Sequence, residues 1–118
     1  MKVEKQRPAG LLQPLPIPEW KWESIAMDFV TGFPKSPKKN DAIWVVVDRL
    51  TKCAHFIPFH LGQSTEILAV KFMRDIVRLH GIPKTITSDR DTRFQSRYWH
   101  SLMDSLGTRL DFTTAYHP

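Results

Sequence analysis

Apolar side chains recur with the two-residue period of β-strands in the first half of the chain. In residues 24–32, apolar side chains alternate with smaller or polar ones, which predicts a half-buried strand. Residues 42–48 are apolar on both faces and predict a central strand. Residues 54–60 predict a third strand, reached through a short turn. The three segments together predict an antiparallel meander.

Between residues 65 and 80, the spacing of the apolar residues changes to the 3.6-residue period of an α-helix. Ser64 is a favourable N-cap residue, and Gly81 is a favourable residue at which the helix ends. The helix is therefore predicted to run between these two positions. Its predicted buried stripe consists of Leu68, Phe72, Ile76 and Leu79.

Three further elements are predicted in the last third of the chain. They are a short strand at 84–88, a helix at 96–106 and a fifth strand at 109–115. The second helix carries an apolar face of Tyr98, Trp99, Leu102, Met103 and Leu106. The order βββαβαβ predicts an α/β fold: a mixed five-stranded sheet with flanking helices, in which strands four and five run parallel to a neighbour.

Proline dominates the segment before the first strand. Pro14, Pro16 and Pro18 alternate with apolar residues, a spacing that favours extended polyproline geometry and excludes a helix. We therefore predict that residues 1–19 form a proline-rich linker and that residues 20–118 form one small domain.

The charge and composition of this domain limit the classes of binding partner and site that it can have. The net charge is +5 and the isoelectric point is near 9.6, which favours an acidic partner, with nucleic acid first. The single cysteine, Cys53, excludes an internal disulfide and a cysteine-rich zinc site. The sequence shows no signal peptide and no run that could cross a membrane, so we expect a nuclear or cytoplasmic protein without a membrane partner.

Two aspartates occupy positions that strands disfavour. Asp28 lies inside the first strand, and Asp89 closes the fourth. A carboxylate removed from water is costly unless it is paired or binds a metal ion. If the two strands were neighbours, the carboxylates would meet and offer the oxygen ligands that Mg²⁺ prefers. Two such ions can hold the attacking and leaving oxygens of a phosphoryl transfer, which normally requires a third acidic residue.

Simpler roles for these aspartates stay open on spacing alone. Asp28 could pair with a Lys or Arg, and Asp89 could open an Asx turn. Asp48 also ends an apolar strand and competes for a place in the site. Its ordinary interpretation is a turn residue, or an ion-pair partner of Arg49 or Lys52.

Basic residues follow the second aspartate and could contact phosphates. Arg90, Arg93 and Arg97 form this cluster, although a solvated loop surface explains them equally well. Asp91 competes as a metal ligand, and its alternative is an ion pair with Arg90 or Arg93. His117 is expected near the edge of the site because the fifth strand ends there, with a solvated loop histidine as the alternative.

Several long motifs resemble one family. They are residues 6–15 (QRPAGLLQPL), 18–23 (PEWKWE), 27–32 (MDFVTG), 44–52 (WVVVDRLTK), 88–94 (SDRDTRF) and 114–118 (TAYHP). In order and content they are similar to the linker and integrase catalytic core of gypsy-type LTR retrotransposon polyproteins, especially those of plants. The resemblance covers nearly the whole chain from about residue 6.

The resemblance implies a ribonuclease H-like fold and a DDE polynucleotidyl transferase that binds two Mg²⁺ or Mn²⁺ ions. Such enzymes process the ends of element DNA and join them to target DNA. By motif, Asp28 corresponds to the first catalytic, metal-binding aspartate and Asp89 to the second. Asp48 and Asp91 match family positions outside the metal triad.

The sequence departs from the family at its carboxyl end. The family carries a third catalytic residue, a Glu, on a helix beyond the fifth strand, and no Glu follows Asp89 here. We therefore expect a partial core that lacks the final catalytic helix, is inactive alone, and self-associates through the uncovered sheet. The alternative is a non-catalytic, basic nucleic-acid-binding or interaction remnant.

Overall fold

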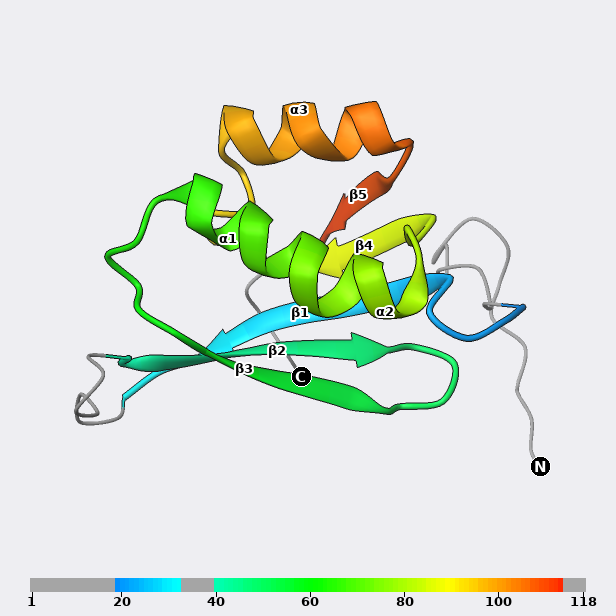
Figure 1. The fold of residues 1–118 in the computed structure, drawn as a ribbon, viewed down its shortest axis with the longest axis horizontal. Helices are drawn as coiled ribbons and strands as arrows, with labels where there is room; N and C mark the ends of the chain where they lie inside the picture. The colour runs from blue at the N-terminus through cyan, green and yellow to red at the C-terminus, as the bar shows by residue number, and fades with distance from the viewer. Residues whose placement is uncertain (1–18, 33–39, 114–118) are drawn as a thin grey trace, which may run out of the picture.

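Five strands form one mixed sheet in the computed structural model, which describes residues 19–32 and 40–113 (Figure 1). The sheet order is β3-β2-β1-β4-β5. β2 runs antiparallel to β1 and β3, whereas β4 runs parallel to β1 and β5. The predicted meander and mixed sheet are therefore confirmed. The strands are β1 (Ser24–Val30), β2 (Ala42–Asp48), β3 (Ala54–Phe59), β4 (Thr85–Ser88) and β5 (Arg109–Phe112).

The strand boundaries differ from the predicted ones mainly at the ends of the elements. β1 and β3 end before the predicted limits of 32 and 60, and β4 begins one residue later than predicted. β5 ends at Phe112, although the backbone N–H of Thr113 still donates to the carbonyl of Ser88 at 2.8 Å. The remainder of the predicted fifth strand lies outside the described residues.

Two helical stretches cover the same side of the sheet (Figure 1). The first runs through α1 (Thr65–Phe72), a π-helical turn η1 (Met73–Val77) and α2 (Arg78–His80); the second is α3 (Arg97–Leu106). Ser64 caps α1 by accepting a hydrogen bond from the backbone N–H of Ile67 at 3.4 Å. Gly81, with φ of +85°, ends the stretch in a conformation that suits glycine. The predicted 65–80 helix and its cap are confirmed.

The π turn changes which side chains of the first stretch are buried. Phe72 and Ile76 are buried as predicted, but Leu79, the expected last member of the stripe, is 53% exposed. A π turn inserts an extra residue and rotates the following side chains about the helix axis. The prediction for Leu79 was wrong because it assumed an uninterrupted α-helical period.

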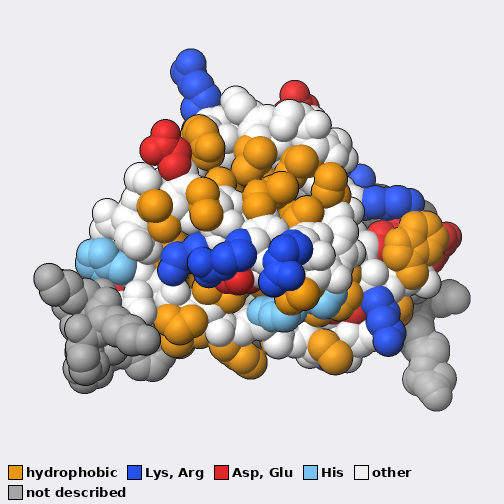
Figure 2. All heavy atoms as spheres, viewed as in Figure 1, with side chains coloured by type: hydrophobic (Ala, Val, Ile, Leu, Met, Phe, Trp, Pro, Cys, Tyr) orange, Lys and Arg blue, Asp and Glu red, His pale blue; other side chains and the backbone are white. Residues whose placement is uncertain are grey.

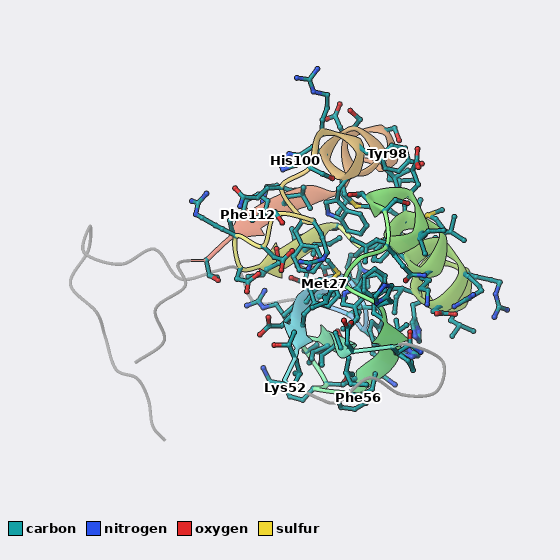
Figure 3. All side chains as sticks on the ribbon, turned by 90° about the vertical axis from the view of Figure 1, so that its left-hand side faces the viewer. Met27, Lys52, Phe56, Tyr98, His100 and Phe112 are labelled. Carbon is teal, nitrogen blue, oxygen red and sulfur yellow. The ribbon has the colours of Figure 1, made fainter. Side chains whose placement is uncertain are left out.

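Helix α3 begins and ends where its sequence predicts. The Ser96 hydroxyl accepts a hydrogen bond from the N–H of Trp99 at 3.2 Å, and Gly107 takes the left-handed conformation with φ of +78°. Trp99 and Met103 are fully buried, whereas Tyr98 is 48% exposed (Figure 3). Tyr98 was therefore wrongly assigned to the buried face of this helix.

The core lies between the sheet and the helices and is rich in aromatic rings. The Trp44 ring of β2 lies 6.3 Å from Phe72 of α1, and Phe72 meets Trp99 of α3 edge-on at 5.3 Å. These contacts tie both helical stretches to the sheet. Aliphatic side chains fill the remaining space: Ile25 and Met27 of β1, Val46 of β2, Ile57 of β3, Leu68 of α1, Ile76 of η1 and Ile86 of β4.

The described helices leave the opposite face of the sheet uncovered. Because side chains alternate along a strand, Asp28 and Val30 of β1 point to this helix-free face, as does Phe56 of β3. Val30 is 47% exposed and Phe56 is 67% exposed, and Figure 3 places Phe56 at the end of the molecule opposite α3. These two exposed apolar side chains on one sheet face offer a surface for association.

The outer edge of β3 is protected against pairing with another strand. Pro58 has no backbone N–H, and its carbonyl accepts a hydrogen bond from the Lys71 ammonium group at 3.3 Å. A proline at this place is compatible with an edge strand only. The edge therefore offers no free donor at Pro58 and no free acceptor there.

The helical side of the molecule combines basic and apolar side chains. Lys71, Arg74 and Arg78 project from the first helical stretch, and Figure 2 shows basic groups crossing this face beneath apolar ones. The exposed apolar side chains on the same stretch include Ile67 and Val70. No helix in the described part of the chain is long and apolar enough to span a membrane.

We predict that the helix-free face drives self-association. Replacing the exposed Phe56 with Lys should weaken association by about tenfold or more, because burying a phenylalanine side chain stabilises by roughly 1.5–3 kcal/mol. Sedimentation equilibrium under reducing conditions measures this, with reductant present because Cys53 is exposed. Ile67→Lys on the helical face is the matched control and should have no effect. A wild-type chain that stays monomeric would contradict the prediction.

Candidate functional site

The pairing of β1 with β4 brings Asp28 and Asp89 to one hollow. Met27 pairs with Ser88 in the parallel register, and an aspartate follows each of them: Asp28 within β1 and Asp89 directly after the end of β4. Paired residues of neighbouring strands present their side chains on the same face. Both aspartates line a cavity of about 230 Å³ on the helix-free face, together with Ala26, Met27, Val45, Val47, Thr87, Ser88 and Thr113.

Asp28 reaches solvent although it lies inside a strand. Its side chain is exposed, and one carboxylate oxygen accepts a hydrogen bond from the backbone N–H of Phe29 at 2.8 Å. The residue therefore does not carry the burial penalty that drew attention to it in the sequence. Its position is accommodated because the helix-free face is open above it.

Asp89 shapes the loop that follows β4. Its Oδ1 accepts a hydrogen bond from the backbone N–H of Asp91 at 3.1 Å, which is the geometry of an Asx turn. The turn that we considered as an alternative role is therefore present. It fixes the orientation of a carboxylate that also lines the hollow, so the two roles coexist at Asp89.

Asp48 has a structural role on the other side of the sheet. It is fully buried and accepts hydrogen bonds from the N–H of Trp22 at 2.9 Å and from the hydroxyl of Thr51 at 2.7 Å. Burial opposes ionisation of this carboxyl, but the hydrogen bonds outweigh burial and hold the pKa of Asp48 below its ordinary value. Asp48 is thus the turn residue of its simpler interpretation.

Asp91 and Arg93 are engaged with each other. The Arg93 guanidinium pairs with the Asp91 carboxylate, which also accepts a hydrogen bond from the backbone N–H of Arg93 at 2.9 Å. The same guanidinium lies over the Phe29 ring at 5.1 Å, on the helix-covered side. The ion pair expected as the alternative role of Asp91 is present, and Arg93 is half-buried.

The other basic residues of the predicted cluster are more accessible. Arg90 and Arg97 are exposed; Arg90 lies 5.7 Å from the centre of the Phe112 ring, and Arg97 begins α3. Both could meet phosphate groups near the loop after β4. His117 lies outside the described residues, so its place near the site stays a prediction.

The donor set of the hollow fits only part of a two-ion site. Asp28 and Asp89 supply hard carboxylate oxygens of the kind that Mg²⁺ and Mn²⁺ prefer. Within residues 19–32 and 40–113, however, no group of three or more His, Cys, Asp or Glu side chains is arranged to hold a metal ion. The described residues therefore do not complete the carboxylate set that a two-ion mechanism requires.

One polar cluster escaped prediction from the sequence. His55 of β3 and His80 of α2 place their Nε2 atoms 2.8 Å apart, and the Trp22 ring stacks on His80 at 3.9 Å. Trp22 adopts φ of +62°, a strained conformation for a residue with a side chain. The three residues are far apart in sequence, so no spacing pattern could reveal their contact.

Comparison with known proteins finds similarity to a segment of transposon polyproteins. It aligns with the Tf2-3 and Tf2-4 transposon polyproteins of Schizosaccharomyces pombe at 36% identity over 117 residues. The alignment covers 99% of this chain and 9% of each polyprotein, so the chain spans about a tenth of these relatives. The chain is homologous to a segment of the Tf2 retrotransposon polyproteins. No family model matches the sequence.

Solved structures identify the fold. The HTLV-2 integrase catalytic core domain in complex with magnesium superposes in its dimeric form with a TM-score of 0.64 at 16% identity, covering 80% of this chain and 62% of that one. Its trimeric form gives the same TM-score over 78% of this chain and 60% of that one. The predicted ribonuclease H-like fold is confirmed.

We predict that the turn and the charge of Asp89 can be separated by substitution. Asp89→Asn keeps a side-chain oxygen that can accept from the Asp91 N–H, so its midpoint of thermal unfolding should match that of the wild type. Asp89→Ala removes the acceptor and should lower the free energy of unfolding by about 1 kcal/mol. Equal stability of the two variants would contradict a structural role for this hydrogen bond.

Proposed function

We propose that this chain is the catalytic-core portion of a retrotransposon integrase, a DDE polynucleotidyl transferase of the gypsy type with plant-like motifs. The observation that carries the proposal is the shared hollow of Asp28 and Asp89 in a fold that resembles an integrase core. Homology to transposon polyproteins supports it independently. The reaction class would be the joining of element DNA ends to target DNA.

In this proposal Asp28 and Asp89 are the two catalytic carboxylates, and they bind Mg²⁺ or Mn²⁺ weakly. A bound ion would supply positive charge to the reacting phosphate. The open face beside Asp28 gives a DNA strand access to the hollow, and the Asx turn orients the Asp89 carboxylate toward it. Arg90, Arg97 and His117 would contact the phosphate backbone, and Arg93 would support the loop.

We further propose that the 118-residue chain is inactive on its own. A two-ion mechanism places several carboxylates around the ions, and the described residues gather only two of them in the hollow. The same shortage supports the second candidate, a non-catalytic basic module that binds nucleic acid or another protein. The net charge of +5 is consistent with both candidates, because basic side chains can contact nucleic-acid phosphates with or without catalysis.

The proposed partners are DNA and further copies of the chain. The similar HTLV-2 core was solved in dimeric and trimeric forms, and the helix-free face here is apolar and exposed. The proposed compartment is the nucleus or the cytoplasm, which agrees with a DNA substrate.

We predict that strand transfer by this chain on short duplex DNA with Mn²⁺ stays near background. Calorimetric titration should nevertheless detect Mn²⁺ binding that Asp28→Asn and Asp89→Asn each weaken by tenfold or more, because each substitution removes one anionic ligand. Asp104→Asn, an exposed position on α3, is the matched control and should bind Mn²⁺ like the wild type.

The outcomes separate the candidates. Robust strand transfer that Asp28→Asn abolishes would support the catalytic core and refute the inactivity of this chain. Mn²⁺ binding that neither aspartate substitution weakens would remove the site assignment and leave the non-catalytic module.

We predict different effects for the three arginines on DNA binding. Arg90→Ala and Arg97→Ala should each reduce the slope of log affinity against log salt concentration by up to about 0.9, the contribution of one phosphate contact. Arg93→Ala should mainly lower thermal stability, because it removes the partner of Asp91. Arg74→Ala, whose guanidinium pairs with Asp75 on the helical side, is the control for nonspecific charge loss. An unchanged salt slope in both variants would refute the phosphate contacts.

A further inference from the structure

The imidazoles of His55 and His80 form a pair in which like atoms face each other. Their Nε2 atoms are 2.8 Å apart, so one ring donates the proton and the other accepts it. The pair joins the edge strand β3 to the end of α2. Both side chains are half-buried, which limits their freedom without closing them off from water.

The spacing of the two nitrogens is close to that of two histidine ligands on one metal ion. In a tetrahedral site with metal–nitrogen bonds of about 2.0–2.1 Å, two imidazole nitrogens lie roughly 3.3 Å apart. The observed 2.8 Å is therefore within about 0.5 Å of that separation. Binding an ion would require the two nitrogens to move apart by about 0.5 Å and both rings to turn toward it.

The surroundings hold the rings and provide access. Trp22 stacks on His80 with ring planes inclined by 10°, and it meets His55 at 5.3 Å, so its indole restricts both imidazoles. The backbone N–H of Trp22 is bonded in turn to the buried Asp48. His55 also lines a solvent-open hollow of about 350 Å³ between β3 and the first helical stretch, which exposes this ring to solvent and is lined further by Lys71, Arg74 and Asp75.

We propose that His55 and His80 form a transition-metal site, separate from the two aspartates, that binds an ion such as Zn²⁺ or Cu²⁺ through the two Nε2 atoms. Water completes the coordination. Imidazole nitrogen suits these ions, whereas Mg²⁺ and Mn²⁺ prefer the carboxylate oxygens of Asp28 and Asp89. The site would fasten β3 to α2 and thereby hold Trp22 in place. The proposal does not depend on the integrase function.

The protonation states of the pair are compatible with metal binding. Both Nε2 atoms must be free of protons, so the imidazole that donates within the pair must carry its proton on Nδ1 instead.

The test uses the full chain in a Cys53→Ser background, because the exposed thiol could itself bind a soft metal. Cu²⁺ should quench tryptophan fluorescence saturably, because Trp22 lies against the site, and calorimetry should find one Zn²⁺ per chain. Trp22→Phe should keep Zn²⁺ binding and lose most of the quenching. Saturating Zn²⁺ should raise the midpoint of thermal unfolding by roughly 10 °C at a hundredfold excess over Kd.

Substitution of His80 or His55 tests whether the two imidazoles bind the metal ion. His80→Gln retains a side chain that can hydrogen bond to His55 but is a poor metal ligand, so it should fold and bind Zn²⁺ at least tenfold more weakly. His55→Gln should behave alike. His100→Ala, on α3 (Figure 3), should bind like the parent. Equal affinity of His80→Gln and the parent, or equal quenching by Mg²⁺, would overturn the proposal.

Discussion

The fold depends on the pairing of β1 with two different strands, β2 on one side and β4 on the other. Its antiparallel pairing with β2 belongs to a local meander, whereas its parallel pairing with β4 requires the whole first helical stretch as a connection. The second pairing sets the register in which Asp28 stands beside Asp89. A slip of one residue would turn Asp28 into the core and Met27 out of it, so burial of Met27 fixes the position of the carboxylate. The register between β1 and β4 therefore determines both which side chains enter the core and where the two aspartates lie.

The buried carboxylate of Asp48 is a second organising point. It receives backbone and side-chain hydrogen bonds from the turn after β2 and from Trp22, which precedes β1. One charged group thereby satisfies donors from two segments that are distant in sequence, and its ionised form is favoured by the number of those donors. The strained backbone of Trp22 is held by this bond and by stacking on His80. The segment that leads into β1 is therefore held in place by the buried Asp48 carboxylate.

Local sequence signals predicted the element order, the sheet type and both ends of the first helix, because these depend on neighbours in sequence. Ser64 and Gly81 act locally and could be identified directly, whereas Ser96 was placed inside the second helix and proved to be its cap. Leu79 and Tyr98 were misplaced because helix rotation and tertiary packing decide their exposure. Asp28 was chosen for a burial that it does not have, and the catalytic roles of Asp28 and Asp89 were taken from the family motifs. The contact of Trp22, His55 and His80 joins three distant segments, which no local pattern encodes.

The protected edge of β3 has a consequence for assembly. Of the two outer strands of the described sheet, β3 is blocked at Pro58 by a missing donor and a carbonyl already bonded to Lys71, which leaves β5 as the edge open to pairing. If two copies join through their sheets, each therefore contributes β5, and a two-fold axis relates them. Pro58 at the outer edge of β3 opposes pairing with a third copy there. Edge-to-edge growth of the described sheet beyond two molecules is therefore disfavoured.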